Sequence, residues 1–247
     1  KGEIYAALPQ DGCAVINADE PWAADWRKST PAGKVLSFGV SEGSDVRLLA
    51  GQQPQLATPL GTIDCRLGLP GRHNLVNAAA AAAVALALDI APAVIERGLA
   101  AVKPVPGRLN LLTTAAGWNV IDDTYNANPA SFYSALQVLS EMQGKAWLVL
   151  GDMKELGQTS YKMHREVGQA ARVLGVSRVF ATGEMSAHAV DAFGTGAVHF
   201  DSREELLAAL LDALKPGVNC LVKGSRSMGM EAVVEAISRD TGMREAS

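Results

Sequence analysis

The chain has 247 residues, and this length predicts two domains rather than one. Hydrophobic residues make up 48% of it and charged residues 19%, with a formal net charge of -4, so the composition excludes a disordered chain and argues against a nucleic-acid-binding protein. Cys13, Cys65 and Cys220 lie far apart, which argues against structural zinc and a disulfide framework and favours a reducing cytoplasm.

The first part of the chain, residues 1–112, mixes short predicted strands with two helices. Its longest apolar stretch, residues 78–88, begins with an alanine run and predicts a closely packed helix, with about half the length that a membrane span needs. Lys1 is not an initiator methionine, so we expect the chain to be a fragment. Residues 45–61 are short for the pair of strands that their composition suggests, which leaves open whether a loop is missing there. Strands are expected near 13–16, 35–38 and 62–67, and helices near 74–88 and 92–101.

From residue 113 onward, five short apolar runs alternate with helical patterns. Pro129 stands where a first helical turn would begin, with Asn128 as its cap. Ser202 and Glu205 form a capping-box signature before another helical pattern. Strands that alternate with helices predict an α/β fold with a mostly parallel, doubly wound sheet. The five runs are 118–121, 147–150, 178–181, 198–200 and 219–222.

Polar side chains follow each of these five predicted strands. In open α/β sheets, ligands bind beyond the carboxyl ends of the strands, so the loops there form the candidate site. Carboxylates and amides dominate the first loop, whereas Lys223 and Arg226 follow the fifth strand. Such an edge suits a zwitterionic or anionic ligand, because arginine can hold a carboxylate with two hydrogen bonds. The loops are 122–128, 151–157, 182–184, 201–202 and 223–227.

Each candidate also has a purely structural interpretation. Aspartate and asparagine are common turn formers, and Asn128 caps a helix whatever else it does. The residues from Lys223 to Arg226 could form a solvated turn, although positive charge is mildly unfavourable near a helix start. His73 could be a histidine with internal partners at a helix entry. Asn74 and Asn77 are three residues apart on one helix face, a spacing at which two amides can contact the edge of a purine.

The sequence has no GxxxxGK[ST] phosphate loop and no GxGxxG motif after a strand. If the protein uses a nucleoside triphosphate, we therefore expect the phosphate-binding loop to lie upstream of Lys1. We also expect neither a GxSxG nucleophile elbow nor an HExxH helix, so a hydrolase has no support in the sequence.

Five short motifs occur along the chain: 69–74 (LPGRHN) with Asn77, 106–108 (PGR), 122–129 (DDTYNANP), 150–157 (LGDMKELG) and 221–227 (LVKGSRS). These motifs and their order resemble those of the Mur ligase family, and the resemblance extends through residue 236. Two of them, DDTYNANP and GDM-x-ELG, are similar to those of the member that adds D-alanyl-D-alanine. The DNPR-like motif of the member that adds the third amino acid is absent from the sequence, and the folate polyglutamate ligases differ in these loops.

The resemblance implies an enzyme of three domains: a UDP-binding domain, a central ATPase domain and a Rossmann-like domain for the incoming amine. Residues 1–109 would be the C-terminal half of the central domain, and residues 110–247 the doubly wound C-terminal domain. We expect a monomeric cytoplasmic protein with no nucleic-acid partner and no membrane span.

The reaction that the resemblance implies joins D-Ala-D-Ala to UDP-MurNAc-tripeptide with ATP and Mg2+. A carboxylate is a poor electrophile because its leaving group would be oxide, whereas an acyl phosphate loses phosphate readily. Transfer of the γ-phosphoryl group would therefore precede attack by the free amine. Catalysis of this kind consists mostly of positioning and of neutralising phosphate charge.

The resemblance also implies roles for individual residues. His73, Asn74 and Asn77 would lie against adenine, and Asp123 would lie at the ribose. Arg108 would reach the phosphates when the domains close. Lys1 corresponds to a lysine that CO2 converts into a carbamate, which helps to hold magnesium; its structural interpretation is an ordinary terminal lysine. The region where tripeptide and dipeptide meet would be lined by Asn126, Asn128, Asp152, Lys223, Ser225 and Arg226.

Two alternatives stay open. One is a related Mur or folate-type ligase with a different amine substrate. The other is a non-catalytic Rossmann-like binding module, which needs no triphosphate. The ligase hypothesis requires a GKT loop and a UDP-binding domain upstream in the full gene, and their absence there would favour the binding module.

Overall fold

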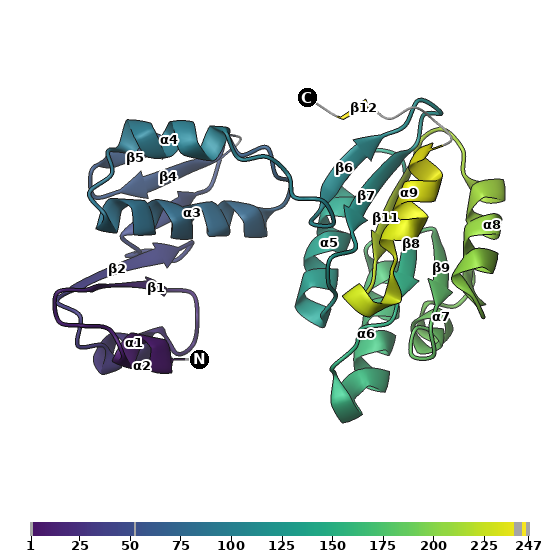
Figure 1. Cartoon of the computed structure of the whole chain (residues 1–247), viewed down its shortest axis with the longest axis horizontal. Coiled ribbons are helices and arrows are strands. Elements are labelled where there is room, and N and C mark those ends of the chain that lie inside the picture. The colour runs from purple at the N-terminus through teal and green to yellow at the C-terminus, as the bar shows by residue number, and fades with distance from the viewer. Residues whose placement is uncertain (1, 52, 240–243, 246–247) are drawn as a thin grey trace. The chain divides into compact units, whose positions relative to one another are not determined.

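The computed structural model describes residues 2–51, 53–239 and 244–245. The chain divides into two units, Lys1–Lys103 and Pro104–Ser247, called here the first and second units (Figure 1). The predicted domain boundary at residue 109 falls shortly after the division between these units. Lys1, the predicted carbamate, lies outside the described residues.

A five-stranded sheet forms the centre of the first unit, with its strands in sequence order. Its first three strands are parallel, and the last two continue it as an antiparallel meander that occupies much of residues 45–61. The strands are β1 (Cys13–Asn17), β2 (Lys34–Gly39), β3 (Val46–Leu49), β4 (Gln55–Thr58) and β5 (Gly61–Asp64), and the helices are α1 (Glu3–Ala6), α2 (Ala23–Ser29), α3 (Arg72–Ala87) and α4 (Pro92–Ala100).

The alanine run forms the buried face of α3, as its sequence predicted. Ala79, Ala82 and Ala83 are each 0% exposed, because a methyl side chain lets the helix approach the sheet closely. They pack in one cluster with apolar side chains of β3, β4 and β5. Neither α3 nor any other helix in the described part of the chain has the length and apolar character needed to cross a membrane.

The second unit contains a seven-stranded sheet in the order β10-β9-β8-β11-β7-β6-β12 (Figure 1). All five predicted strands form and pair in parallel, which confirms the predicted doubly wound sheet. The sequence patterns had not indicated β6 and β12, which extend one edge in antiparallel fashion. The strands are β6 (Asn110–Thr113), β7 (Asn119–Asp123), β8 (Lys145–Gly151), β9 (Arg178–Thr182), β10 (Ala197–Phe200), β11 (Val218–Lys223) and β12 (Arg244–Glu245).

Helices cover both faces of this sheet, because alternate strand residues point to opposite sides. Ile121 and Leu221 belong to the core with α5, α6 and α7, whereas Val120 and Val222 belong to the core with α8 and α9. The helical elements are α5 (Pro129–Glu141), η1 (Gly157–Thr159), α6 (Ser160–Val173), α7 (Ala187–Phe193), α8 (Arg203–Ala213), η2 (Arg226–Met228) and α9 (Glu231–Arg239).

Two predicted helix caps are present. The Asn128 side chain accepts a hydrogen bond from the Ser131 backbone N–H at 2.9 Å, and the Ser131 hydroxyl oxygen accepts one from the Asn128 N–H at 3.1 Å. At α8, the Ser202 hydroxyl oxygen accepts a hydrogen bond from the Glu205 N–H at 3.2 Å. These bonds satisfy backbone donors that the first helical turns leave without a partner.

Close packing of α6 on α7 yields a testable pair of substitutions. A Cβ at Gly168 in α6 would overlap the carbonyl oxygen of Ala189 in α7, whereas a Cβ at Gly98 in α4 would meet no atom within 4 Å. We expect Gly168→Ala to lower the free energy of unfolding by about 1–3 kcal/mol or more. The matched Gly98→Ala should raise it by roughly 0.5–1 kcal/mol, because alanine favours a helix. Urea unfolding followed by circular dichroism measures both, and equal effects would contradict the packing described.

Candidate active site

Three polar loops meet at one edge of the second sheet because of the strand order. The strand β11 lies between β7 and β8, so Lys223 is paired in register with Asp123 of β7 and Leu150 of β8. The chain thus reverses its winding direction here, and such a switch point is where open α/β sheets bind ligands. The loops after β7, β8 and β11 are those that the sequence marked as candidates.

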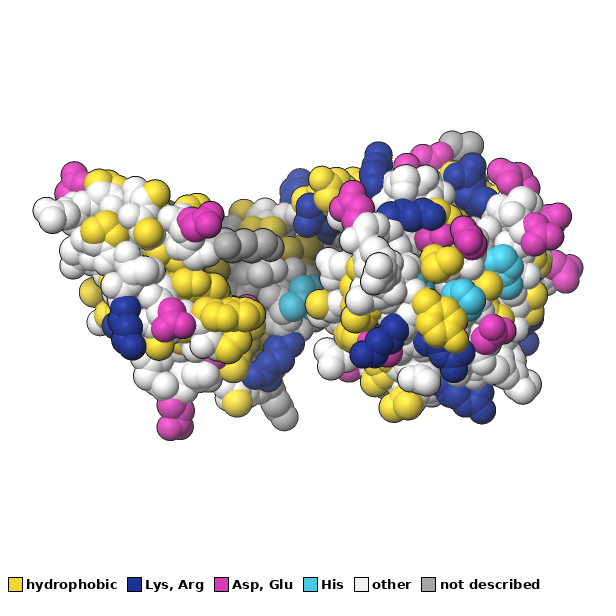
Figure 2. Space-filling view, turned by 90° about the horizontal axis from the view of Figure 1, so that it is seen from below, with side chains coloured by type: hydrophobic (Ala, Val, Ile, Leu, Met, Phe, Trp, Pro, Cys, Tyr) yellow, Lys and Arg dark blue, Asp and Glu magenta, His cyan; other side chains and the backbone are white. Residues whose placement is uncertain are grey.

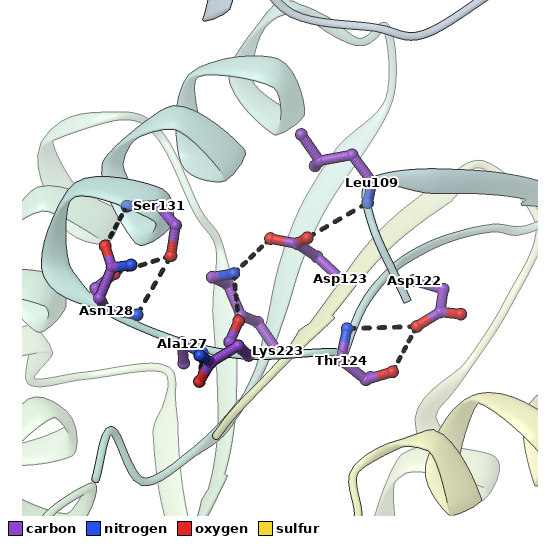
Figure 3. A network of polar contacts seen from close by, with 9 residues as sticks. Leu109, Asp122, Asp123, Thr124, Ala127, Asn128, Ser131 and Lys223 are labelled. Carbon is purple, nitrogen blue, oxygen red and sulfur yellow. Dashed lines mark hydrogen bonds and ion pairs between the residues drawn. The ribbon is translucent and has the colours of Figure 1, made fainter. Parts of the chain in front are cut away.

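Lys223 and Asp123 form a buried ion pair at the centre of this edge (Figure 3). The Lys223 side chain is 1% exposed, and its Nζ donates hydrogen bonds to Asp123 Oδ2 and, at 2.9 Å, to the Asn126 carbonyl oxygen. Its ammonium group also lies 5.3 Å from the centre of the Phe132 ring. Burial lowers the pKa of Lys223, and the Asp123 carboxylate opposes that shift. The charge of Lys223 is therefore paired with the Asp123 carboxylate of the protein itself.

The two adjacent aspartates hold the backbone on either side of Arg108. Asp122 Oδ2 accepts a hydrogen bond from the Gly107 N–H at 2.9 Å, and Asp123 Oδ1 accepts one from the Leu109 N–H at 3.2 Å. Gly107 has φ +78°, where a Cβ would come 3.0 Å from the Tyr125 backbone nitrogen. Glycine fits this turn because it has no side chain to clash there.

Arg108 itself points outward from this turn. Its side chain is exposed, and its guanidinium carbon lies 4.2 Å from the centre of the Tyr125 ring. A cation over an aromatic face is weakly stabilised, so the stack orders the arginine while leaving it accessible. Of the predicted cations in the second unit, Arg108 and Arg226 are thus accessible and Lys223 is not.

Asp152 locks the loop after β8 to the loops after β9 and β11. Its side chain is fully buried; Oδ1 accepts a hydrogen bond from the Ser186 N–H at 2.8 Å, and Oδ2 pairs with Lys154 Nζ at 2.9 Å. The Ser225 N–H donates to the Asp152 carbonyl oxygen at 2.9 Å, and the Ser225 hydroxyl oxygen accepts from the Lys154 N–H at 2.8 Å. These four bonds satisfy buried polar groups and fix the three loops relative to one another.

The other predicted residues of the second unit lie at the surface. Arg226 is 66% exposed in its side chain and makes a 3.6 Å ion pair with Glu231. Asn126 and Asn128 are exposed, although Asn128 also caps α5. On the face seen in Figure 2, acidic and basic side chains are mixed over this unit rather than gathered into a patch of one sign.

The predicted adenine-contacting residues lie in the first unit, at the start of α3. His73 is half-buried and Asn77 is exposed. The Asn74 side-chain amide donates to the Pro70 carbonyl oxygen at 2.7 Å, which leaves its side-chain oxygen as an acceptor. The structure therefore places these three residues and the Arg108 site in different units.

Sequence reasoning overlooked a GxSxG string at residues 39–43 (GVSEG). In the structure, this string connects β2 to β3, whereas a nucleophile elbow connects a strand to a helix. The Ser41 hydroxyl donates to Asp19 Oδ1 at 2.6 Å. The serine thus belongs to a turn that Asp19 stabilises, and the string does not support a hydrolase.

Four residues that support the loops were not selected from the sequence: Asp122, Lys154, His164 and Ser186. Asp122 and Lys154 stand inside motifs already marked, so their charge was an available signal. Ser186 and His164 bind the loop after β8 from other parts of the fold, and no local sequence pattern predicts these two contacts. No group of three histidine, cysteine, aspartate or glutamate side chains in the described part of the chain could hold a metal ion.

Two family models match consecutive parts of the chain. The Mur ligase middle domain matches residues 1–85, and the Mur ligase glutamate ligase domain matches residues 107–226. The chain therefore belongs to the Mur ligases.

Relatives within this family carry one recurrent name. The chain is 39% identical, over 97% of its length, to UDP-N-acetylmuramoyl-tripeptide--D-alanyl-D-alanine ligase of Escherichia coli (strain K12), and 32% identical, over 95%, to the Bacillus subtilis (strain 168) protein of that name. It covers 55% and 53% of these two proteins, and so spans about half the length of the curated relatives it matches.

Solved structures agree with these relatives. A crystal structure of MurF from Acinetobacter baumannii superposes with a TM-score of 0.86 at 32% identity, covering 97% of this chain and 54% of that one. MurF ligase from Thermotoga maritima in complex with ADP gives a TM-score of 0.82 at 26% identity, covering 96% and 56%. The fold of both units is thus that of the corresponding part of these ligases.

The buried ion pair predicts a large effect of removing its cation. In Lys223→Met, the Asp123 carboxylate would remain buried without its partner, so we expect the free energy of unfolding to fall by about 3–5 kcal/mol. Lys162→Met is the matched control: Lys162 is 72% exposed in its side chain and pairs with Glu166 on the helix surface. Its loss should cost less than about 1 kcal/mol. Comparable losses in urea unfolding of the two variants would contradict the structural role assigned to Lys223.

Proposed function

We propose that the chain is part of an ATP-dependent amide ligase that joins D-alanyl-D-alanine to UDP-MurNAc-tripeptide. One observation carries this proposal. The motif loops after β7, β8 and β11 converge on one sheet edge beside an exposed Arg108, in a chain 39% identical to a ligase with that name. A binding module without catalysis would not need an arginine held outward by two buried carboxylates.

Two functional parts are proposed. Residues 1–109 would form the C-terminal half of the ATP-binding domain, and residues 110–247 the domain that receives the amine. Although Arg108 precedes this boundary, it lies in the second structural unit and would move with the second part, because Asp122 and Asp123 bind the backbone at Gly107 and Leu109. A cytoplasmic location fits the free thiols of Cys13, Cys65 and Cys220.

The chemistry requires activation of a carboxylate. Its oxygen would attack the γ-phosphorus of ATP, releasing ADP and forming an acyl phosphate. The neutral amine of D-Ala-D-Ala would then attack the acyl carbon, and the tetrahedral intermediate would lose phosphate and a proton to give the amide. Arg108 would stabilise the charge on the transferring phosphoryl group, because an exposed guanidinium can form two hydrogen bonds to phosphate oxygens.

Some residues at the sheet edge would contact the substrates, and others would support the loops. Exposed Arg226, Asn126 and Asn128 would contact the two substrates, with Arg226 holding a carboxylate. Asp152 and Ser225 are buried and would position those loops, as would Lys223. Asp123 would reach the ribose with the lone pairs that Lys223 and the Leu109 N–H leave available.

At the nucleotide base, His73, Asn74 and Asn77 would contact adenine from the start of α3. Mg2+ is proposed as the ion that accompanies ATP, with Lys1 as a carbamate among its ligands. Among the described residues, no group of three histidine, cysteine, aspartate or glutamate side chains could hold this ion.

The proposed function is tested with the full-length gene product. Purified enzyme with ATP, UDP-MurNAc-tripeptide and D-Ala-D-Ala should form the UDP-MurNAc-pentapeptide, with one ADP and one phosphate released for each amide. Mass spectrometry and coupled phosphate release measure both. D-glutamate and diaminopimelate, offered as alternative amines, should give no product. Ligation of one of these instead would favour a related ligase, and no ATP-dependent ligation of any amine would favour the binding module.

The role of Arg108 is tested in the same assay. Arg108→Ala should lower kcat by roughly 10²-fold or more, as the loss of a contact made to developing charge does. Binding of the UDP-tripeptide should change little, because the arginine acts on phosphate. Arg97→Ala, which removes an exposed arginine from α4, is the control and should keep the kcat of the unmodified enzyme. A kcat for Arg108→Ala equal to that of the control would reduce Arg108 to a domain-boundary residue.

A further inference from the structure

A buried histidine behind the loop after β8 has no part in the proposed chemistry. The His164 side chain on α6 is 0% exposed. Its Nε2 lies 2.9 Å from the Met153 backbone nitrogen, which can only donate, so Nε2 must accept this hydrogen bond. Its Nδ1 lies 2.8 Å from the Ser160 carbonyl oxygen, which can only accept, so Nδ1 must carry the proton. Both partners together require the neutral ring with its proton on Nδ1.

Met153, the residue that His164 holds, is central to the loop network. It lies between Asp152, which binds the Ser186 N–H, and Lys154, whose N–H binds the Ser225 hydroxyl oxygen. The Ser225 N–H in turn binds the Asp152 carbonyl oxygen. A displacement of the Met153 peptide would therefore also displace the loop after β11, which carries Arg226.

We propose that His164 is a positioning residue that sets the loops after β8 and β11 for the amine substrate, through its hydrogen bond to the Met153 N–H. This inference rests on the proposed ligase function for its catalytic consequence. The hydrogen bond itself is a property of the fold and is testable without catalysis. Because only the neutral ring can accept from Met153, the loops keep this arrangement only while His164 is unprotonated.

The surroundings of His164 keep it neutral. Burial lowers the pKa of His164, while the hydrogen bond to the Ser160 carbonyl and the Asp152 carboxylate oppose that shift. His188 on α7 and Lys154 on the loop add to the lowering. Protonation would place a second N–H against the Met153 N–H and remove that amide's acceptor.

The direction of the pH effect follows from linkage. In the unfolded chain, His164 would bind a proton below a pH of about 6.5. The folded chain binds it only at lower pH, so the unfolded state carries more protons in between. The stabilising contribution of neutral His164 is thus complete above a pH of about 6.5 and is lost as the pH falls toward its folded pKa.

Three variants separate positioning from general structural support. His164→Leu fills much of the volume of the histidine ring but has no hydrogen-bond acceptor. His164→Gln restores an uncharged acceptor near the Nε2 position. His188→Gln removes the neighbouring histidine, which contacts the Tyr161 ring. The first readout is hydrogen exchange of the Met153 amide, corrected for its intrinsic rate, from pH 5 to 8. The second, in the full-length enzyme, is KM for D-Ala-D-Ala, KM for ATP and kcat.

In His164→Leu, we expect Met153 exchange to accelerate at least tenfold and KM for D-Ala-D-Ala to rise about tenfold, with KM for ATP changed less than twofold. His164→Gln should recover most of both losses and should abolish the loss of Met153 protection that the unmodified protein undergoes at acid pH. His188→Gln should retain the KM values of the unmodified protein and its Met153 protection near pH 8, and its loss of protection at acid pH should begin at a slightly higher pH, because His188 helps to lower the pKa of His164.

Two results would overturn the inference. One is unchanged Met153 exchange in His164→Leu. The other is faster exchange with an unchanged KM for D-Ala-D-Ala in an active enzyme, which would make His164 a structural residue only. If His164→Leu fails to fold, the pH dependence in His164→Gln decides: a loss of Met153 protection at acid pH equal to that of the unmodified protein overturns the inference. An inactive unmodified enzyme would refute the ligase function, while the exchange measurements would still test the hydrogen bond.

Discussion

The organisation of the candidate site depends on one buried ion pair, between Lys223 and Asp123. The two side chains extend from neighbouring parallel strands in direct register, so the sheet itself brings them together. A charged group that is buried is stable only with an opposite charge and further hydrogen bonds. The Asn126 carbonyl oxygen accepts such a bond from Lys223, and the Leu109 N–H donates one to Asp123. The ion pair therefore ties the loop after β7 and the turn of Arg108 to the end of β11.

This arrangement separates two kinds of polar residue within the same motifs. Buried side chains such as Asp122 and Asp152 each accept a hydrogen bond from a backbone N–H and thereby fix the shape of the loops. Exposed side chains such as Arg108 and Arg226 remain at the surface, where a ligand can reach them. Rigid support beneath accessible charges holds them in place before a ligand arrives, which lowers the entropic cost of binding.

The network extends beyond the sheet edge into the helices. The Ser186 N–H after β9 and the His164 ring on α6 both bind the loop after β8, so that loop is held from two sides. Every partner in this network is a neutral donor or acceptor or a paired charge, as buried polar groups require. The loop geometry thus depends on protonation states as well as on packing.

The sequence alone determined the features that local interactions decide. The period of apolar residues predicted all five parallel strands, the alanine run predicted a closely packed helix, and Asn128 and Ser202 predicted two helix starts. The motif strings identified the polar loops and the family. These patterns suffice because side-chain alternation, helix spacing and capping act over a few residues.

Only the tertiary structure decided which of these features meet. The order β7-β11-β8 brings Lys223 to Asp123 across 100 residues of sequence, and packing of α6 brings His164 to Met153. Lys223 ends β11 and Arg226 lies three residues later, and the two look alike as cations in the sequence, yet the side chain of Lys223 is 1% exposed and that of Arg226 is 66% exposed. Burial depends on strand order and on the partners that packing supplies, and neither is encoded in the local spacing of residues.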